Sequence, residues 1–128
     1  MKVLIVEDDF ISRRLMLHFL YPLGECDVAV NGSEAMEAFM EAAKVGQQYD
    51  LVTLDIMMPE MCGQEALMRI RLYEEEQGLE AAKIIMTTVL KDRSNVLDSF
   101  YNQCDGYLVK PINPKELLKM LVEFNLLD

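Results

Sequence analysis

The chain has 128 residues, 52% of them apolar, and a formal net charge of −10 from 12 basic and 22 acidic side chains. This length predicts one domain over residues 1–128 with no room for an output domain, and the apolar content excludes extensive disorder. The acidic balance argues against direct binding to DNA or RNA, because a negative surface repels phosphate backbones.

The cysteines indicate neither a disulfide framework nor a zinc site. Cys26, Cys62 and Cys104 are odd in number and widely spaced, and His18 is the only histidine. This pattern is typical of reduced thiols in a cytoplasmic protein. No stretch approaches the ~20 apolar residues that span a bilayer, and the N-terminus does not resemble a signal peptide. We therefore expect a cytoplasmic protein without membrane insertion.

Short apolar runs alternate with longer stretches of helical spacing. The runs that predict strands are 2–6, 27–30, 50–54, 83–88 and 106–109. The apolar stripes that predict the helices between and after them are Ile11, Leu15, Phe19 and Leu20; Ala35, Met36, Phe39, Met40 and Ala43; Ala66, Leu67 and Ile70; Val96, Leu97 and Phe100; and Leu117, Leu118, Leu121 and Val122. Asn113, Pro114 and Glu116 provide a start signal for the last helix. Strict alternation predicts an α/β fold with a doubly wound five-stranded parallel sheet and helices on both faces.

Polar side chains gather where the predicted strands end, which is where open parallel sheets bind ligands. In chain order they are Glu7, Asp8 and Asp9; Asp55; Thr87 and Thr88; and Lys110. Clustered carboxylates require a cation, and Mg²⁺ prefers oxygen ligands. A carboxylate can also attack phosphorus while a lysine and a hydroxyl neutralise the transferring group. Each residue alone could be a cap or a solvated side chain, but their joint placement favours a phosphoryl site.

Four segments carry a family resemblance that extends over nearly the whole chain. They read VLIVEDD at 3–9, LDIMMPEMCG at 54–63, IIMTT at 84–88 and GYLVKP at 106–111. In this order and spacing they resemble the receiver domain of two-component response regulators, in particular single-domain, chemotaxis-like receivers. The resemblance implies a flavodoxin-like receiver fold.

The resemblance also implies residue roles around the metal. Asp55 looks like the phosphoacceptor. Glu7 and Asp8 look like the acidic pair, with Asp8 binding Mg²⁺ directly and Glu7 acting mainly through water; Asp8 and Asp9 are the alternative pair. The third ligand would be the backbone carbonyl of Met57.

Further roles concern the phosphoryl group and the switch. Lys110 would contact the phosphoryl group, and the family pattern places a cis peptide bond before Pro111. Thr88 and Tyr107 would be the switch pair, in which the hydroxyl moves toward the phosphoryl group and the ring turns inward. Thr87 is the alternative switch hydroxyl.

Some positions depart from the common family pattern. Cys62 stands where the family often has Asp, and Val89 replaces a frequent Ala. Met57 and Leu90 occupy variable positions that tune loss of the phosphoryl group. Both are apolar and cannot orient an attacking water, so we expect a long-lived acyl phosphate.

These features predict a stand-alone response regulator rather than an enzyme. The phosphodonor would be a histidine kinase or a histidine phosphotransfer protein, and a downstream protein would bind the face formed by about 92–128. A monomer or weak dimer is expected. One alternative is a Mg²⁺-dependent phosphohydrolase, but Met57 stands where such an enzyme needs a second acid. The other alternative is an interaction domain that is never phosphorylated.

Overall fold

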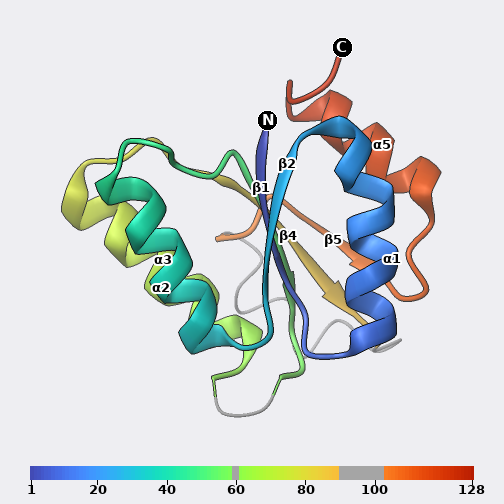
Figure 1. The fold of residues 1–128 in the computed structure, drawn as a ribbon, viewed down its shortest axis with the longest axis horizontal. Helices are drawn as coiled ribbons and strands as arrows, with labels where there is room; N and C mark the ends of the chain where they lie inside the picture. Colours follow the sequence, from blue (N-terminus) through green and yellow to red (C-terminus); the bar gives the residue numbers. More distant parts are fainter. Residues whose placement is uncertain (59–60, 90–102) are drawn as a thin grey trace.

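Five parallel strands form one sheet in the computed structural model, which describes residues 1–58, 61–89 and 103–128 (Figure 1). The strands are β1 (Lys2–Val6), β2 (Glu25–Ala29), β3 (Leu51–Asp55), β4 (Lys83–Thr88) and β5 (Gly106–Val109). Their order across the sheet is β2-β1-β3-β4-β5. This arrangement confirms the predicted doubly wound sheet, with β2 beginning earlier and β3 ending one residue later than the sequence indicated.

Helices cover both faces of the sheet, as predicted. They are α1 (Phe10–Leu20), α2 (Gly32–Lys44), α3 (Gly63–Gln77) and α5 (Pro114–Glu123), and a short 3₁₀ turn (Tyr21–Leu23) follows α1. Figure 1 shows α2 and α3 on one face and α1 and α5 on the other. The predicted helix around Val96, Leu97 and Phe100 lies outside the described residues. None of the helices in the described ranges combines the length and apolar content that a bilayer crossing demands.

Side-chain caps explain where three helices begin. Asp9 accepts a hydrogen bond from the backbone N–H of Ser12 at the start of α1, at 2.8 Å. Asn31 caps α2 in the same way, and Asn113 accepts from the N–H of Lys115 at 2.9 Å to start α5. These side chains satisfy amide groups that a helix cannot pair internally.

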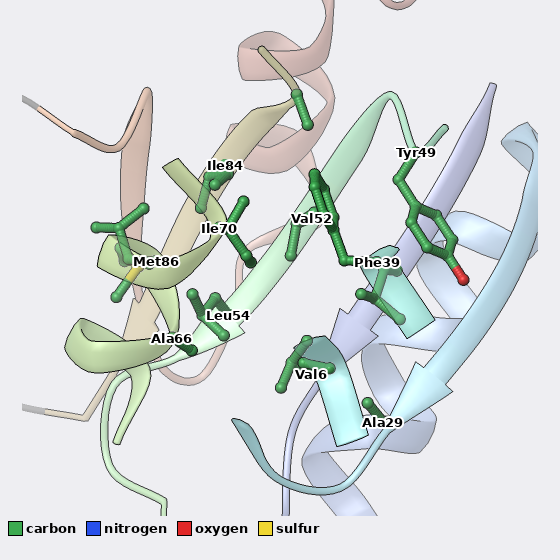
Figure 2. Close-up of a cluster of buried hydrophobic side chains, with 14 of the residues drawn as sticks. Val6, Ala29, Phe39, Tyr49, Val52, Leu54, Ala66, Ile70, Ile84 and Met86 are labelled. Atoms are coloured by element: carbon green, nitrogen blue, oxygen red, sulfur yellow. The ribbon is translucent and has the colours of Figure 1, made fainter. Parts of the chain in front are cut away.

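One buried cluster fills each face of the sheet. On the α2 and α3 side, Phe39, Leu67 and Ile70 pack against the central strands, and Figure 2 shows part of this cluster. On the α1 and α5 side, Leu20 and Leu117 are fully buried. The central strands are therefore covered on both faces, which is why apolar residues predominate in their sequences.

The predicted buried stripes were too wide on the helices of the α1 and α5 face. Ile11 is 63% exposed and Leu15 is 48% exposed on α1. On α5, Leu118 and Val122 are 42% and 47% exposed, so their prediction as core residues was wrong. A helix on a flat sheet buries a narrow strip, while apolar residues beside that strip keep the same periodicity.

Candidate functional site

The carboxyl ends of β1 and β3 bring acidic side chains together at the centre of the sheet. Carboxylate oxygens of Glu7, Asp8 and Asp55 all lie within 4.8 Å of one another. The carboxylate of Asp9 is not part of this group; it caps α1 by accepting a hydrogen bond from the N–H of Ser12. The backbone N–H of Asp9 donates to Glu7 Oε2 at 3.1 Å and so orients Glu7. The geometry therefore groups Glu7, rather than Asp9, with Asp8.

Lys110 completes the cluster from the end of β5. Its Nζ forms an ion pair with Glu7 Oε1 and lies 3.4 Å from Asp55 Oδ1. Its backbone N–H donates to the carbonyl of Thr88 at 2.7 Å, which fixes the start of the loop after β5. The peptide bond from Lys110 to Pro111 is cis. One ammonium thus bridges two nearly inaccessible carboxylates.

Charge crowding perturbs the titration of this cluster. Burial, a hydrogen bond with Glu7 and the charge of Glu7 raise the pKa of Asp55 to about 7, although Lys110 opposes the rise. Burial disfavours the ammonium of Lys110, yet the hydrogen bond with Glu7 and the charges of Asp55 and Glu7 raise its pKa overall. Asp55 therefore binds a proton more readily than an isolated aspartate does, and a divalent cation would compete with that proton. Three carboxylates with only oxygen donors suit Mg²⁺.

Arg13 is a site residue that sequence reasoning missed. The sequence analysis gave it no role, but its guanidinium Nη1 donates to the carbonyl of Glu7 at 3.0 Å. It also reaches the carbonyl of Asp8 at 3.4 Å. The available signal was its place one helical turn after the Asp9 cap, which directs a long side chain back over the preceding loop. Arg13 therefore holds the backbone that presents the acidic pair.

Gly63 sets the distance between α3 and the end of β3. A Cβ atom at this position would lie 2.2 Å from the carbonyl oxygen of Asp55 and 2.8 Å from Cα of Ile56. The N–H of Gly63 also donates to the carbonyl of Ile56 at 3.0 Å. Glycine is therefore required here because backbone meets backbone at the candidate phosphoacceptor.

The two threonines of β4 point to opposite faces of the sheet, as successive strand residues do. Met86 belongs to the buried cluster under α2 and α3, and Tyr107 packs against the same cluster. Thr88 lies two residues after Met86 on the same strand, so its side chain points to the same face, and it is fully buried. Thr87 lies on the other face, where it lines an apolar cleft of about 270 Å³ beside α1. Thr88 is thus the threonine that shares its face with Tyr107.

The loop after β3 begins at the cluster and leads away from it. The backbone N–H of Met57 donates to Asp55 Oδ1 at 3.3 Å, while its side chain is 60% exposed. Val89 is 62% exposed at the end of β4. Pro59, Glu60 and Leu90 lie outside the described residues. Apolar side chains therefore stand at the described rim of the site.

Comparison with known proteins identifies the family, because the family model of the response regulator receiver domain matches residues 3–122. The chain belongs to the response regulator receiver domain family. Response regulator TrrA of Thermotoga maritima, solved with Mg²⁺ and BeF, is 34% identical with a TM-score of 0.78, covering 96% of this chain and 97% of its own. The co-crystal of the Saccharomyces cerevisiae phosphotransfer protein Ypd1 with the receiver of Ssk1 gives 28% identity and a TM-score of 0.83, covering 97% and 88%.

Curated relatives are longer proteins that contain a similar region. The transcriptional regulatory protein ResD of Bacillus subtilis is 35% identical over 121 residues, which are 91% of this chain and 45% of ResD. The osmosensing histidine kinase SLN1 of Saccharomyces cerevisiae is 27% identical over 96% of this chain and 10% of its own length. The receiver chain thus spans less than half of these relatives.

Replacing Gly63 with Ala should disrupt the site. The added Cβ must push α3 away from the Asp55 carbonyl, so we expect destabilisation of roughly 1–3 kcal/mol, the range for overpacking. Urea unfolding followed by circular dichroism measures it. Cys62→Ala, at the neighbouring half-buried position, is the matched control and should change stability by less than half as much. Equal stability of Gly63→Ala and the parent would contradict the required close approach.

The metal-free protein should lose stability as pH rises. The pKa of Asp55 is about 7 in the folded chain against its ordinary value of 3.8, so the folded state binds the proton more tightly. Its stabilising contribution is complete below about pH 4 and disappears as pH rises through about 7. Asp55→Asn should therefore be increasingly more stable than the parent between these values, measured by urea unfolding in EDTA. A stability difference independent of pH would contradict the raised pKa.

Proposed function

We propose that residues 1–128 act as one receiver unit that is phosphorylated on Asp55 with Mg²⁺ bound beside it. The observation that carries this proposal is the convergence of Glu7, Asp8, Asp55 and Lys110 at the ends of three strands. Mg²⁺ would be held by these three carboxylates, Glu7 acting mainly through water, and by the carbonyl of Met57. Membership of the receiver family supports the same reading.

Asp55 would act as the nucleophile. One of its carboxylate oxygens attacks the phosphorus of a phosphohistidine, an oxygen–phosphorus bond forms, and the phosphorus–nitrogen bond to the departing imidazole breaks. Lys110, already 3.4 Å from Asp55, would follow the phosphoryl oxygens and balance their charge. Thr88 would donate its hydroxyl hydrogen to another phosphoryl oxygen. Bound Mg²⁺ supplies charge neutralisation for the transferring group and the crowded carboxylates.

The signal would arise from a shift between two conformations. Thr88 and Tyr107 lie on the same face of adjacent strands, and Met86 pairs in register with Tyr107. Movement of the Thr88 hydroxyl toward a phosphoryl group would free space for the ring of Tyr107. A downstream protein would read this change at the face formed by about 92–128, of which β5 and α5 are described.

A histidine kinase or histidine phosphotransfer protein is the proposed donor, by similarity to the Ssk1 receiver crystallised with Ypd1. We place the protein in the cytoplasm, as a monomer or weak dimer, with no direct role in nucleic-acid binding. None of its three cysteines, all of which lie in the described ranges, forms a disulfide, and this suits a reducing compartment. Steady turnover as a phosphohydrolase is disfavoured, because Met57 supplies no acid two residues after Asp55.

Intact-mass measurement tests the phosphoacceptor. The parent incubated with Mg²⁺ and acetyl phosphate should gain one phosphoryl group, since Asp55 is the nucleophile and the cation offsets its charge. Asp55→Asn and a sample in EDTA should gain none. Asp50→Asn, an exposed aspartate near the opposite end of β3, is the matched control and should label like the parent. Labelling of the Asp55 variant to the parent's extent would exclude Asp55 as the acceptor.

The acyl phosphate should persist for minutes or longer without a phosphatase. The Met57 side chain is apolar and exposed, so it cannot orient a water for attack. Met57→Asn adds a hydrogen-bonding group and should shorten the half-life several-fold, followed by loss of the labelled mass over time. Met68→Asn, on an exposed part of α3, should leave it unchanged. A parent half-life of seconds would contradict the expectation.

A further inference from the structure

Three methionines of this chain line one groove on its surface. There are ten in 128 residues, and only Met16, Met58 and Met86 are buried. Met36, Met40 and Met61 are half-buried and line one open groove, and Met36 and Met61 also pack against the buried cluster under α2 and α3. Unbranched thioether side chains adapt to differently shaped partners, so their concentration in a groove suits partner binding as well as packing.

The groove runs between α2 and α3, which lie side by side on one face of the molecule (Figure 1). It measures about 350 Å³. Its walls are two helical stripes and one loop residue: Ser33, Met36 and Met40; Arg69, Leu72, Tyr73 and Glu76; and Met61. Each stripe extends over about two helical turns, or roughly 10 Å. This length matches the apolar face of a short partner helix with anchors at i, i+3 or i+4, and i+7.

Backbone contact fixes one end of the groove. Gly32 opens α2, and a Cβ atom there would lie 2.7 Å from Cβ of Met61. Met61 can therefore rest directly on the start of the helix. The apolar surface also continues outward along α3, where Leu72 is 56% exposed and Met68 is 48% exposed. One helical turn separates these two side chains, so they extend a single strip.

The rim of the groove is acidic. Glu37 lies on α2 between the levels of Ser33 and Met40, and Glu76 lines the groove from α3. Both are exposed. Arg69 is the one basic side chain among the described lining residues, and it is paired with Glu65 at 3.2 Å. The free charge at the rim is therefore negative, which favours a cationic occupant.

We propose that this methionine-lined groove binds a basic amphipathic helix of a partner protein. Leucine-sized side chains of that helix would lie against Met36, Met40 and Leu72, and its lysines or arginines would meet Glu37 and Glu76. A second copy of this chain is a poor occupant, because its net charge of −10 would be repelled. The surface lies on α2 and α3, apart from the β5 and α5 surface assigned to signalling above.

Binding of a designed peptide tests the proposal. The probe is a labelled 18-residue helix with leucines on one face and lysines on the other, and its comparison has glutamates in place of the lysines. With the full chain, fluorescence anisotropy should show saturable binding of the lysine peptide only. Raising the salt from 50 to 500 mM should weaken binding by about tenfold, since the rim contacts are exposed. Equal binding of both peptides would overturn the proposal.

Two substitutions on α3 and two on α5 localise the binding. Leu72→Lys and Glu76→Lys should each weaken it by about tenfold or more. Val122→Lys and Glu123→Lys place the same changes on exposed positions of α5 and should alter it less than twofold. Circular dichroism confirms that each variant is folded. Loss of binding in the α5 variants, with the α3 variants unaffected, would assign the peptide to another face and overturn the proposal.

Methyl resonances give a second readout that needs no substitution in the groove. With ¹³C-methyl methionine, signals of Met36, Met40 and Met61 should shift on addition of the lysine peptide, while the buried Met16 and Met86 stay in place. Shifts confined to Met57 would place the peptide at the phosphorylation site and overturn the proposal. A parent that sediments as an oligomer, but becomes monomeric with Leu72→Lys, would assign the groove to a second copy and also overturn it.

Discussion

The rest of the site depends on one constraint, the crowding of carboxylates at the adjacent carboxyl ends of β1 and β3. Glu7 and Asp55 are each only 4% exposed, so water cannot screen their repulsion. The ammonium of Lys110 pairs with both carboxylates, and the pKa of Asp55 is raised to about 7. In the proposed reaction a metal ion would replace the proton, and Lys110 would turn from the carboxylates to the phosphoryl group. The site is thus held together by interactions that its proposed reaction must rearrange, which ties chemistry to conformation.

Much of this architecture could be predicted because parallel sheets impose simple rules on sequence. The buried strands β1 and β4 contain the uninterrupted apolar runs 3–6 and 84–86, and the polar residues at their carboxyl ends converge where the fold class requires. Edge strand β2 was harder to delimit, since most of it is exposed and it contains the charged residues Glu25 and Asp27. Arg13 carried one signal, its place one helical turn after the Asp9 cap, but the backbone carbonyls that it contacts are marked by no residue type in the sequence.

The two surfaces assigned here differ in physical character. The phosphorylation site is small, buried and highly charged, and its specificity comes from placing a few atoms within hydrogen-bonding distance. The methionine groove is open and apolar with a screened acidic rim, so its selectivity would come from shape adaptation and charge balance. Both surfaces include residues of the connection from β3 to α3 and the helix start that follows it: Gly63 packs on Asp55 at the phosphorylation site, and Met61 packs on Gly32 at the methionine groove.

The first turn of α1 also bears on how long the acidic pair keeps its geometry. Asp9 caps that turn, and Arg13 reaches back from it to the carbonyl of Glu7. Helix ends fray more readily than buried strands, and a local opening breaks every contact that depends on the frayed turn. Fraying of α1 would therefore release both constraints on the loop in one event. Opening of one helical turn would thus loosen a group of carboxylates of which α1 itself supplies none.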